Sequence, residues 1–362
     1  MFSKVDKPLL SVIAVLVIGG FLILASASMV LSQKHYGTST YYILHQVFYA
    51  GILGAIGFLA GVSIPYRWWR RAALPLMLFS LVLASLLFFP GIGVMSGGAK
   101  RWLDLGPFSF QPSELLKFSF VVYLASWLDS KREKIRSISQ GLIPFAVMMA
   151  VVGMFLVMQP DIGTLGVIAA TAGLLYFIGG GRVAQIAGLA VFGLIILYFL
   201  IQAAPYRLDR IRTFLNPALD PQGTGYQITQ ALIGIGSGGF FGQGLGKSAQ
   251  KYHYLPEPMG DSIFAVFAEE MGFLGALVLI ALFAFFLLRG LTVAKRAPDV
   301  FGKLLAAGIA VLITVQAFVN MATISGLLPL TGIPLPFVSY GGTALVINML
   351  SVGVLLNISK HT

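Results

Sequence analysis

The sequence predicts an all-α polytopic membrane protein with about ten transmembrane helices. Hydrophobic residues make up 57% of the 362 residues and charged residues only 10%, whereas soluble domains carry about 25% charged residues. The mean hydropathy is +0.89. Apolar segments of about 20 residues, the length needed to cross a bilayer, recur along the chain. Since no segment has the composition of a soluble domain, we expect residues 1–362 to form a single integral membrane domain.

The apolar segments give ten expected spans. The fourth span is short and polar at its start, and the dipeptide Gln159-Pro160 between the fifth and sixth indicates a tight hairpin. The first apolar run is too long for a cleavable signal peptide and has no evident processing site. In chain order, the spans are 8–32, 41–64, 72–90, 113–128, 141–158, 161–181, 183–202, 262–289, 303–325 and 341–358.

Basic residues predict the orientation of these spans. Cytoplasmic loops are enriched in Lys and Arg, and the short loops of the opposite side carry only Lys34, Lys100 and Arg101. We therefore expect both termini in the cytoplasm. The loops 91–112 and 326–340 then face outward, as does one long extracytoplasmic loop, 203–260, between spans seven and eight. The fifteen basic residues on the expected cytoplasmic side are Lys4, Lys7, Arg67, Arg70, Arg71, Lys131, Arg132, Lys134, Arg136, Arg182, Arg289, Lys295, Arg296, Lys303 and Lys360.

The net charge of +11 is mostly explained by this orientation rule and does not indicate nucleic-acid binding. Long loops contribute little to orientation, so the five cations of the long outer loop need another explanation. They predict an anionic ligand on the outer face, with anionic lipid headgroups as the alternative. These cations are Arg207, Arg210, Arg212, Lys247 and Lys251.

The strongest candidate for catalysis is Asp261, which lies where the long polar loop enters an apolar helix. Ionisable residues at a membrane boundary are costly and usually functional. Desolvation raises the pKa of such a carboxylate and suits it to act as a general base. Helix capping is the structural alternative. Glu257, four residues earlier, is a candidate second acid.

Arginines at 207–212 are suited to bind phosphate oxygens in bidentate fashion, with Arg210 and Arg212 as the candidates for a diphosphate. The glycine run 234–246 permits close backbone approach to a ligand, but it does not have P-loop spacing. A re-entrant loop that needs small residues explains it equally well.

Further charged and polar residues lie near the predicted outer ends of the spans. Glu114 and Lys117 share a helix face, which predicts an ion pair that faces the bundle interior and borders the site. Lys100 and Arg101 precede this span and, with Lys117, are further candidates to bind the diphosphate. Asp161 is expected mainly as a helix cap. Glu269 and Glu270 are expected to be buried, with partners that the sequence does not identify. The hydroxyl of Ser339 is a candidate sugar contact.

Five segments together resemble the SEDS family (shape, elongation, division and sporulation), which includes FtsW and RodA. The resemblance follows the whole chain, and GQGLGKSAQKYHYLPE is more similar to the FtsW division branch. The chain departs from the family pattern PExHTDFIFA, reading PEPMGDSIFA. The segments are KRWLDLGPFSFQPSELLKF (100–118), QPDIGT (159–164), the stretch 207–257, DSIFAVFAEEMGFLG (261–275) and PLPFVSYGGT (334–343).

The resemblance implies a multi-pass protein of the bacterial cytoplasmic (inner) membrane that polymerises lipid II into glycan strands on its outer face. It places the essential loop aspartate of the family at Asp261, and the Glu and Lys of the fourth span at Glu114 and Lys117. The expected reaction is an inverting glycosyl transfer. It also implies a class B penicillin-binding protein as partner, together with undecaprenyl-linked glycan and other membrane proteins of the divisome or elongasome.

No cofactor is required by the sequence. Cysteine is absent, and the four histidines do not have metal-ligand spacing. A divalent cation, Mg²⁺ or Mn²⁺, would assist a diphosphate leaving group, but no ligand cluster requires one. Two other functions remain open: a lipid II flippase that uses the buried charges, and a scaffold that recruits a penicillin-binding protein. The concentration of cations on one face favours the enzyme.

Overall fold

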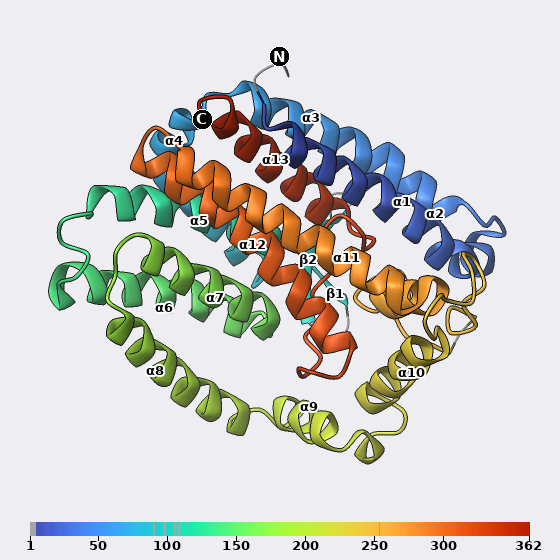
Figure 1. The fold of residues 1–362 in the computed structure, drawn as a ribbon. Helices are drawn as coiled ribbons and strands as arrows, with labels where there is room; N and C mark the ends of the chain where they lie inside the picture. The colour runs from blue at the N-terminus through green and yellow to red at the C-terminus, as the bar shows by residue number, and fades with distance from the viewer. Residues whose placement is uncertain (1–4, 90, 97–98, 105, 107–108, 253) are drawn as a thin grey trace.

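The protein is a helical bundle in which long helices run side by side (Figure 1). The computed structural model describes residues 5–89, 91–96, 99–104, 106, 109–252 and 254–362. The helices of the bundle are α1 (Lys7–Tyr36), α2 (Tyr41–His45), η1 (Gln46–Gly51), α3 (Ile52–Ser63), α4 (Tyr66–Leu86), α5 (Pro112–Ser130), η2 (Ile138–Leu142), α6 (Ile143–Met158), α7 (Ile162–Ile178), α8 (Val183–Gln202), α11 (Ile263–Arg296), α12 (Val300–Ile324) and α13 (Gly342–Ser359).

Eight helices in the described part of the chain are long and apolar enough to cross a membrane. Two are composite: α2, η1 and α3 run together over Tyr41–Ser63, and η2 and α6 over Ile138–Met158. The expected fourth and sixth spans are α5, which carries two buried charges, and α7, which has 17 residues. The polytopic helical fold is thus confirmed.

Several span boundaries differ from the predicted ones. The third helix starts at Tyr66, not at 72, because Pro65 fixes the turn before it. It ends at Leu86, and residue 90 lies outside the described residues. α11 continues to Arg296, beyond the expected end at 289, because basic side chains in its last turn suit the negative end of the helix dipole.

Two of the three predicted outer loops contain regular structure that the sequence did not reveal. The long loop 203–260 includes α9 (Pro205–Leu215), η3 (Pro217–Leu219) and α10 (Thr224–Ser237). The loop 91–112 holds a small antiparallel sheet, which is an exception to the all-α prediction, and its strands are too short to show an alternating pattern. The strands are β1 (Gly93–Ser96), β2 (Ala99–Asp104) and β3 (Ser109–Phe110), in the order β1-β2-β3.

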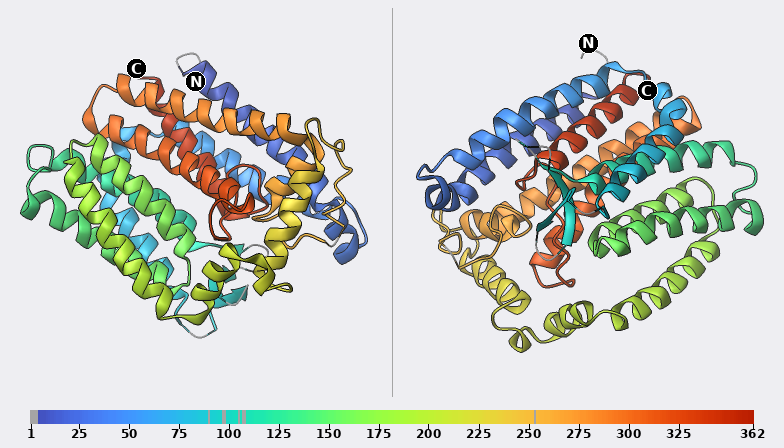
Figure 2. Two further views of the ribbon diagram at one scale, coloured as in Figure 1. Left: turned by 60° about the horizontal axis from the view of Figure 1, so that its bottom comes forward. Right: turned by 180° about the vertical axis from the view of Figure 1, so that it is seen from behind.

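Helix α12 forms the centre of the bundle and is buried along most of its length, packed against α5, α7 and α11. In contrast, α8 lies at the periphery (Figures 1 and 2), and Gln185 is its one buried residue. An apolar helix that is exposed along its length is suited to contact lipid.

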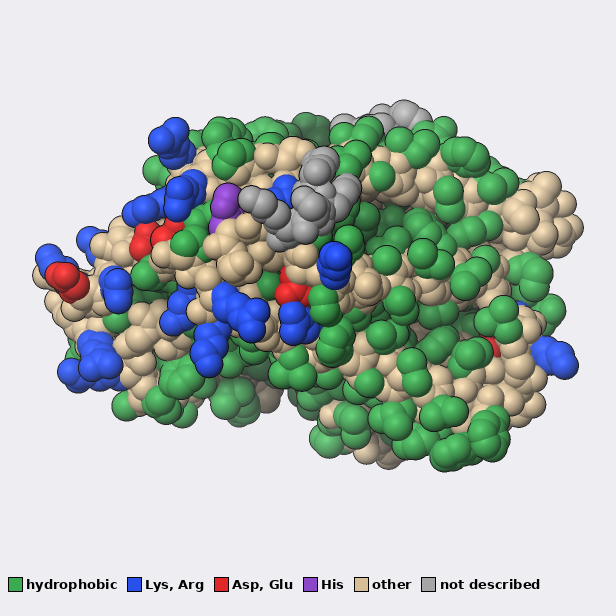
Figure 3. All heavy atoms as spheres, turned by 45° about the horizontal axis from the view of Figure 1, so that its top comes forward, with side chains coloured by type: hydrophobic (Ala, Val, Ile, Leu, Met, Phe, Trp, Pro, Cys, Tyr) green, Lys and Arg blue, Asp and Glu red, His purple; other side chains and the backbone are tan. Residues whose placement is uncertain are grey.

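Both termini lie on the same side of the bundle (Figure 2). Near the N-terminus, the Asp6 amide donates to Ser359 Oγ at 3.1 Å, and the Asp6 carboxylate pairs with Arg289 at 2.5 Å. Lys and Arg side chains gather over one end of the face drawn in Figure 3, and apolar side chains cover most of the other end. This distribution agrees with the predicted asymmetry of basic residues, although Lys4 lies outside the described residues.

Helix α11 is broken after its first turns, at Gly272. This residue has φ 67° and ψ −168°, a backbone conformation that residues other than glycine rarely adopt. The break allows the glycine-rich chain 239–244 to bond to the opened helix. Phe273 N donates to Gly239 O at 2.9 Å, and Gly244 N donates to Glu270 O at 3.0 Å. The segment that begins beside Asp261 is therefore a short helix, set apart from the long remainder of α11.

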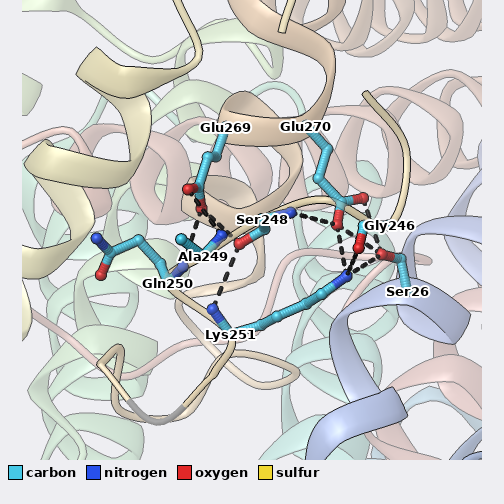
Figure 4. Close-up of polar contacts among 8 residues, drawn as sticks. All are labelled: Ser26, Gly246, Ser248, Ala249, Gln250, Lys251, Glu269 and Glu270. Atoms are coloured by element: carbon cyan, nitrogen blue, oxygen red, sulfur yellow. Dashed lines mark hydrogen bonds and ion pairs between the residues drawn. The ribbon is translucent and has the colours of Figure 1, made fainter. Parts of the chain in front are cut away.

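Glu269 and Glu270 connect this short helix to the outer loop through a buried polar network (Figure 4). The Glu270 carboxylate accepts bonds from Lys251 Nζ at 2.9 Å and from Ser26 Oγ of α1 at 2.6 Å. The Glu269 carboxylate accepts bonds from the Ser248 hydroxyl and from the backbone amides of residues 249 and 250. These are the partners that buried carboxylates require.

The Lys251–Glu270 pair should dominate the stability of this region, because both side chains are almost fully buried. We expect Lys251→Met to lower the free energy of unfolding by about 3–5 kcal/mol, since it leaves a buried carboxylate without its cation. Thermal unfolding in detergent would measure the change. Lys247→Met, at an exposed lysine of the same loop, is the matched control. The double variant Lys251→Met/Glu270→Gln should regain most of the lost stability, and equal losses for the double and single variants would contradict the pairing.

Candidate active site

A cavity of about 460 Å³ opens beside Asp261, at the end of the bundle opposite to the termini. Its polar lining includes Asp261, Glu257, Arg101 and Gln111. Segments from distant parts of the chain form its walls: the α2–η1–α3 helix, the β-sheet, the loop before α11, and the loop that leads into α13. The cavity therefore depends on the packing of the whole bundle.

Asp261 is half-buried and is held by neighbouring amides. Gln227 of α10 donates to Asp261 Oδ1 at 3.3 Å and to Ser262 Oγ at 2.9 Å. The Asp261 carbonyl accepts a bond from Asn320 Nδ2 at 2.8 Å. The N-cap residue of α11 is Ser262, and its side chain makes no capping bond. The capping alternative thus does not account for Asp261, whose carboxylate faces the cavity.

Burial and the negative charge of Glu257 raise the pKa of Asp261 to about 6, although the hydrogen bond from Gln227 acts in the opposite direction. Desolvation is the largest of these effects, because it penalises the charged form of the carboxyl group. A carboxylate with a pKa near 6 is ionised at neutral pH and is a stronger base than an ordinary aspartate.

Two amide side chains of α12 hold the loop that faces Asp261. Asn320 Nδ2 donates to the carbonyl of Ile333 at 2.8 Å, in addition to that of Asp261. One helical turn away, Gln316 Nε2 donates to the carbonyl of Pro334 at 2.9 Å. Sequence reasoning missed both residues, although two amides one turn apart in an apolar helix are a signal, because buried polar groups require partners.

Glu114 and Lys117 form the buried ion pair that the sequence predicted, with 2.8 Å between Lys117 Nζ and Glu114 Oε1. Lys117 Nζ also donates to Gln316 Oε1 at 2.5 Å. Neither charged residue is among those that line the cavity. They reach the site through Gln316, whose amide they orient towards the loop at Pro334.

Two arginines lie close to Asp261. Arg101, on β2, lines the cavity and donates to the carbonyls of Gln159 and Pro160. Arg210, on α9, lies 3.5 Å from the carbonyl of Leu330. Burial lowers the pKa of Arg210, the positive charge of Arg101 lowers it further, and the charge of Asp261 acts in the opposite direction. The two guanidinium groups therefore share one electrostatic environment, which favours an anion between them.

Other predicted site residues lie elsewhere. Arg212 pairs with Asp209 at 3.7 Å, and its side chain is 61% exposed. It faces away because residues two apart on a helix project in different directions. Lys100 is exposed, since consecutive strand residues point to opposite faces. Ser339 Oγ donates to the carbonyl of Gly260 at 2.7 Å and accepts from Leu335 N at 2.8 Å, so it holds the turn before Asp261.

The two other acidic candidates have separate roles. Asp161 caps α7, because its Oδ1 accepts the Thr164 amide at 3.1 Å, as the capping prediction required. Glu257 lines the cavity, and its carbonyl accepts the amides of Gly260 and Ser262. Within the described part of the chain, which does not include His253, no group of three or more His, Cys, Asp or Glu side chains is placed to hold a metal ion.

Fold and site together define a class: a polytopic membrane protein with acidic and basic side chains around a cavity at one end of its bundle. The profile of the FtsW/RodA/SpoVE family, described as cell cycle protein, matches residues 7–362. The chain therefore belongs to this family.

Similar proteins extend the comparison. The chain is 41% identical over 357 residues to a probable peptidoglycan glycosyltransferase FtsW of Trichlorobacter lovleyi, covering 99% of this chain and 93% of that protein. It is 39% identical over 365 residues to stage V sporulation protein E of Bacillus subtilis, covering all of both chains. Among solved structures, a chain of a peptidoglycan synthase complex that coordinates polymerization and crosslinking matches with a TM-score of 0.80 at 27% identity, covering 99% of this chain and 98% of that one.

The influence of Glu257 on Asp261 is directly testable. We expect Glu257→Gln to lower the pKa of Asp261 below about 6, because it removes a nearby negative charge. The pKa should stay above 3.8, since the burial remains. Carbon-13 NMR of labelled aspartate carboxyl groups, with the Asp261 signal assigned by Asp261→Asn, would follow the titration. Glu133→Gln, at an exposed position, is the control, and an unchanged midpoint in Glu257→Gln would refute the coupling.

Proposed function

We propose that this protein is a peptidoglycan glycosyltransferase that polymerises lipid II into glycan strands on the outer face of the bacterial cytoplasmic membrane. The observation that carries the proposal is the position of Asp261, a half-buried carboxylate with a pKa near 6 that lines a cavity together with Arg101 and interacts electrostatically with Arg210. The peptidoglycan glycosyltransferase name of similar proteins supports the same activity.

The reaction is an inverting glycosyl transfer. The 4-hydroxyl of an acceptor GlcNAc attacks the anomeric carbon of a donor MurNAc. The new bond joins this oxygen to the anomeric carbon, and the bond from that carbon to the diphosphate oxygen breaks. Asp261 takes the hydroxyl proton as general base. Undecaprenyl diphosphate leaves with the bonding electrons, and Arg101 and Arg210 stabilise its developing charge.

The lipid carriers account for a site near the membrane surface. Prenyl chains remain in the bilayer while the sugars reach the outer loops, so both substrates approach along the same interface. With both termini in the cytoplasm, as the basic residues predict, the cavity faces outward. Lys117 and Glu114 support the site from within the bundle by orienting Gln316.

A class B penicillin-binding protein is the proposed partner, because polymer made at this site must be cross-linked. The structural similarity to a chain of a synthase complex that coordinates polymerization and crosslinking supports this pairing. Further partners are other membrane proteins of the division machinery, which the similarity to FtsW proteins favours over those of elongation.

Asp261→Asn tests the role of the base. We expect glycan polymerisation from purified lipid II, in the presence of the partner, to fall by about 10²–10⁴-fold. The folded protein should be at least as stable as the parent at pH 7.5. The raised pKa means that ionised Asp261 costs stability above about pH 6, and this cost vanishes as the carboxyl group is protonated at lower pH. Undiminished polymerisation by a folded variant would reject the assignment.

Arg210→Ala tests the diphosphate contact. The variant should lower kcat/KM for lipid II by about a hundredfold, because it removes one of two charges that meet the leaving group. Arg212→Ala is the matched control, two residues away on α9 and exposed to solvent. Steady-state kinetics of both variants would measure kcat/KM for lipid II. Equal losses in Arg210→Ala and Arg212→Ala would contradict the assignment of Arg210 to the site.

A further inference from the structure

The residues that line the cavity beside Asp261 are of two chemical kinds. The charged and amide side chains are Arg101, Gln111, Glu257 and Asp261. The described residues that α2, η1, α3, α13 and the loop before α13 contribute to the lining include no acidic side chains and no Lys or Arg, and are mostly aromatic and aliphatic. A diphosphate is matched by the first group only, so the second group suits an uncharged part of a substrate.

His45, Tyr49 and Tyr340 belong to this second group and are called the aromatic wall below. The ring centroids of His45 and Tyr49 are 4.6 Å apart, and those of His45 and Tyr340 are 6.1 Å apart. The Tyr340 hydroxyl and His45 Nδ1 are 3.0 Å apart, within hydrogen-bond distance. The wall thus offers flat ring surfaces together with polar groups at their edges, the combination that small-molecule sites use for orientation.

Tyr340 is directly connected to the loop that carries Asp261. Its backbone amide donates to the carbonyl of Met259 at 2.8 Å. Burial raises the pKa of Tyr340 to about 12, so its hydroxyl stays protonated at physiological pH and keeps its hydrogen to donate. This backbone hydrogen bond, made two residues before Asp261, fixes the position of Tyr340 relative to Asp261.

One residue of this wall lies in an irregular part of the backbone. Tyr49 is in the π-helical turn Gln46–Gly51, a feature that is frequent at functional sites. The cavity lining also includes the aliphatic side chains of Leu53, Val346 and Ile347. The aromatic wall is therefore accompanied by apolar residues of α3 and α13, which belong to segments long and apolar enough to cross a membrane.

We propose that His45, Tyr49 and Tyr340 form a saccharide subsite that holds the acceptor sugar against Asp261. The C–H faces of a pyranose ring pack on aromatic faces, whose negative quadrupole attracts their partial positive charge. Sugar hydroxyls bond to the Tyr340 hydroxyl and the His45 ring. The diphosphate of the donor is left to Arg101, which lines the cavity, and to Arg210. The subsite rests on the proposed glycosyl transfer, in which the acceptor is the second substrate. It gives this acceptor a binding place beside Asp261.

Interfacial anchoring is the competing explanation, since tyrosines gather at membrane surfaces. It fits Tyr36 and Tyr41, which are exposed and stack on each other with their ring centroids 3.5 Å apart. Neither of these residues lines the cavity. Tyr340 differs because it is half-buried, hydrogen-bonded and faces the cavity. The exposed residues Tyr36 and Tyr41 can therefore be compared directly with Tyr340, which lines the cavity.

The experiment measures binding of the soluble GlcNAc–MurNAc disaccharide, which lacks both lipid and diphosphate, to the full-length protein in nanodiscs. Saturation-transfer NMR gives the Kd. We expect Tyr49→Ala and Tyr340→Ala each to weaken binding about tenfold, equivalent to about 1.4 kcal/mol. Tyr340→Phe, which keeps the ring, should retain most of the affinity. Tyr41→Ala is the control and should leave the Kd unchanged.

Unaltered disaccharide binding in both Tyr49→Ala and Tyr340→Ala would overturn the subsite, as would an equal loss in Tyr41→Ala. Tyr49 is 45% exposed, so its replacement keeps the test valid even where Tyr340→Ala does not fold. A different result would contradict the proposed function itself: the parent would bind disaccharide through these rings yet make no glycan from lipid II. A parent that polymerises lipid II, with variants that bind disaccharide normally, would refute the subsite alone.

Discussion

The site depends on the break of α11 at Gly272. Without it, residues 263–271 would lie on the same axis as the rest of the 34-residue helix α11. With it, the first turns form a separate helix, which the outer loop holds from both sides. Backbone amides of the loop bond to carbonyls opened by the break, and Glu269 and Glu270 bond to Ser248 and Lys251 of the same loop. Positive φ is readily available to glycine, so one residue type makes this arrangement possible.

Two buried polar networks share the task of holding the cavity walls. The network around Glu270 fixes the chain that leads into Asp261, and the chain from Glu114 through Lys117 to Gln316 fixes the opposite loop at Pro334. Buried hydrogen-bonded networks of this kind favour one arrangement of the interior. Asp261 is different, because its burial costs stability at neutral pH, as its raised pKa indicates. The surrounding packing offsets this local cost.

The features that could be predicted from the sequence are those that depend on local spacing. It predicted the polytopic helical fold from hydropathy, the Glu114–Lys117 pair from its spacing, and the cap at Asp161 from its position before a helix. It did not identify the partner of Glu270, because Ser26 is 244 positions away in the chain. It placed Arg212 with Arg210, although the orientation of α9, which is set by tertiary packing, turns only Arg210 inward. The amides of Gln316 and Asn320 were not predicted, because the carbonyl groups of Pro334 and Ile333 that they bond come near them only in the folded protein.

The contact between α3 and α13 has a mechanical consequence. A β-carbon at Gly61 would lie 2.6 Å from the carbonyl oxygen of Leu350, and one at Gly353 would lie 2.5 Å from that of Phe58. The two backbones therefore touch, and neither helix can slide along the other without a steric clash. The pair α3 and α13 therefore behaves as a stiff unit, whereas the peripheral α8 has few neighbours to restrain it. A change in the width of the cavity is then easier by movement of its other walls than by shear between these two helices.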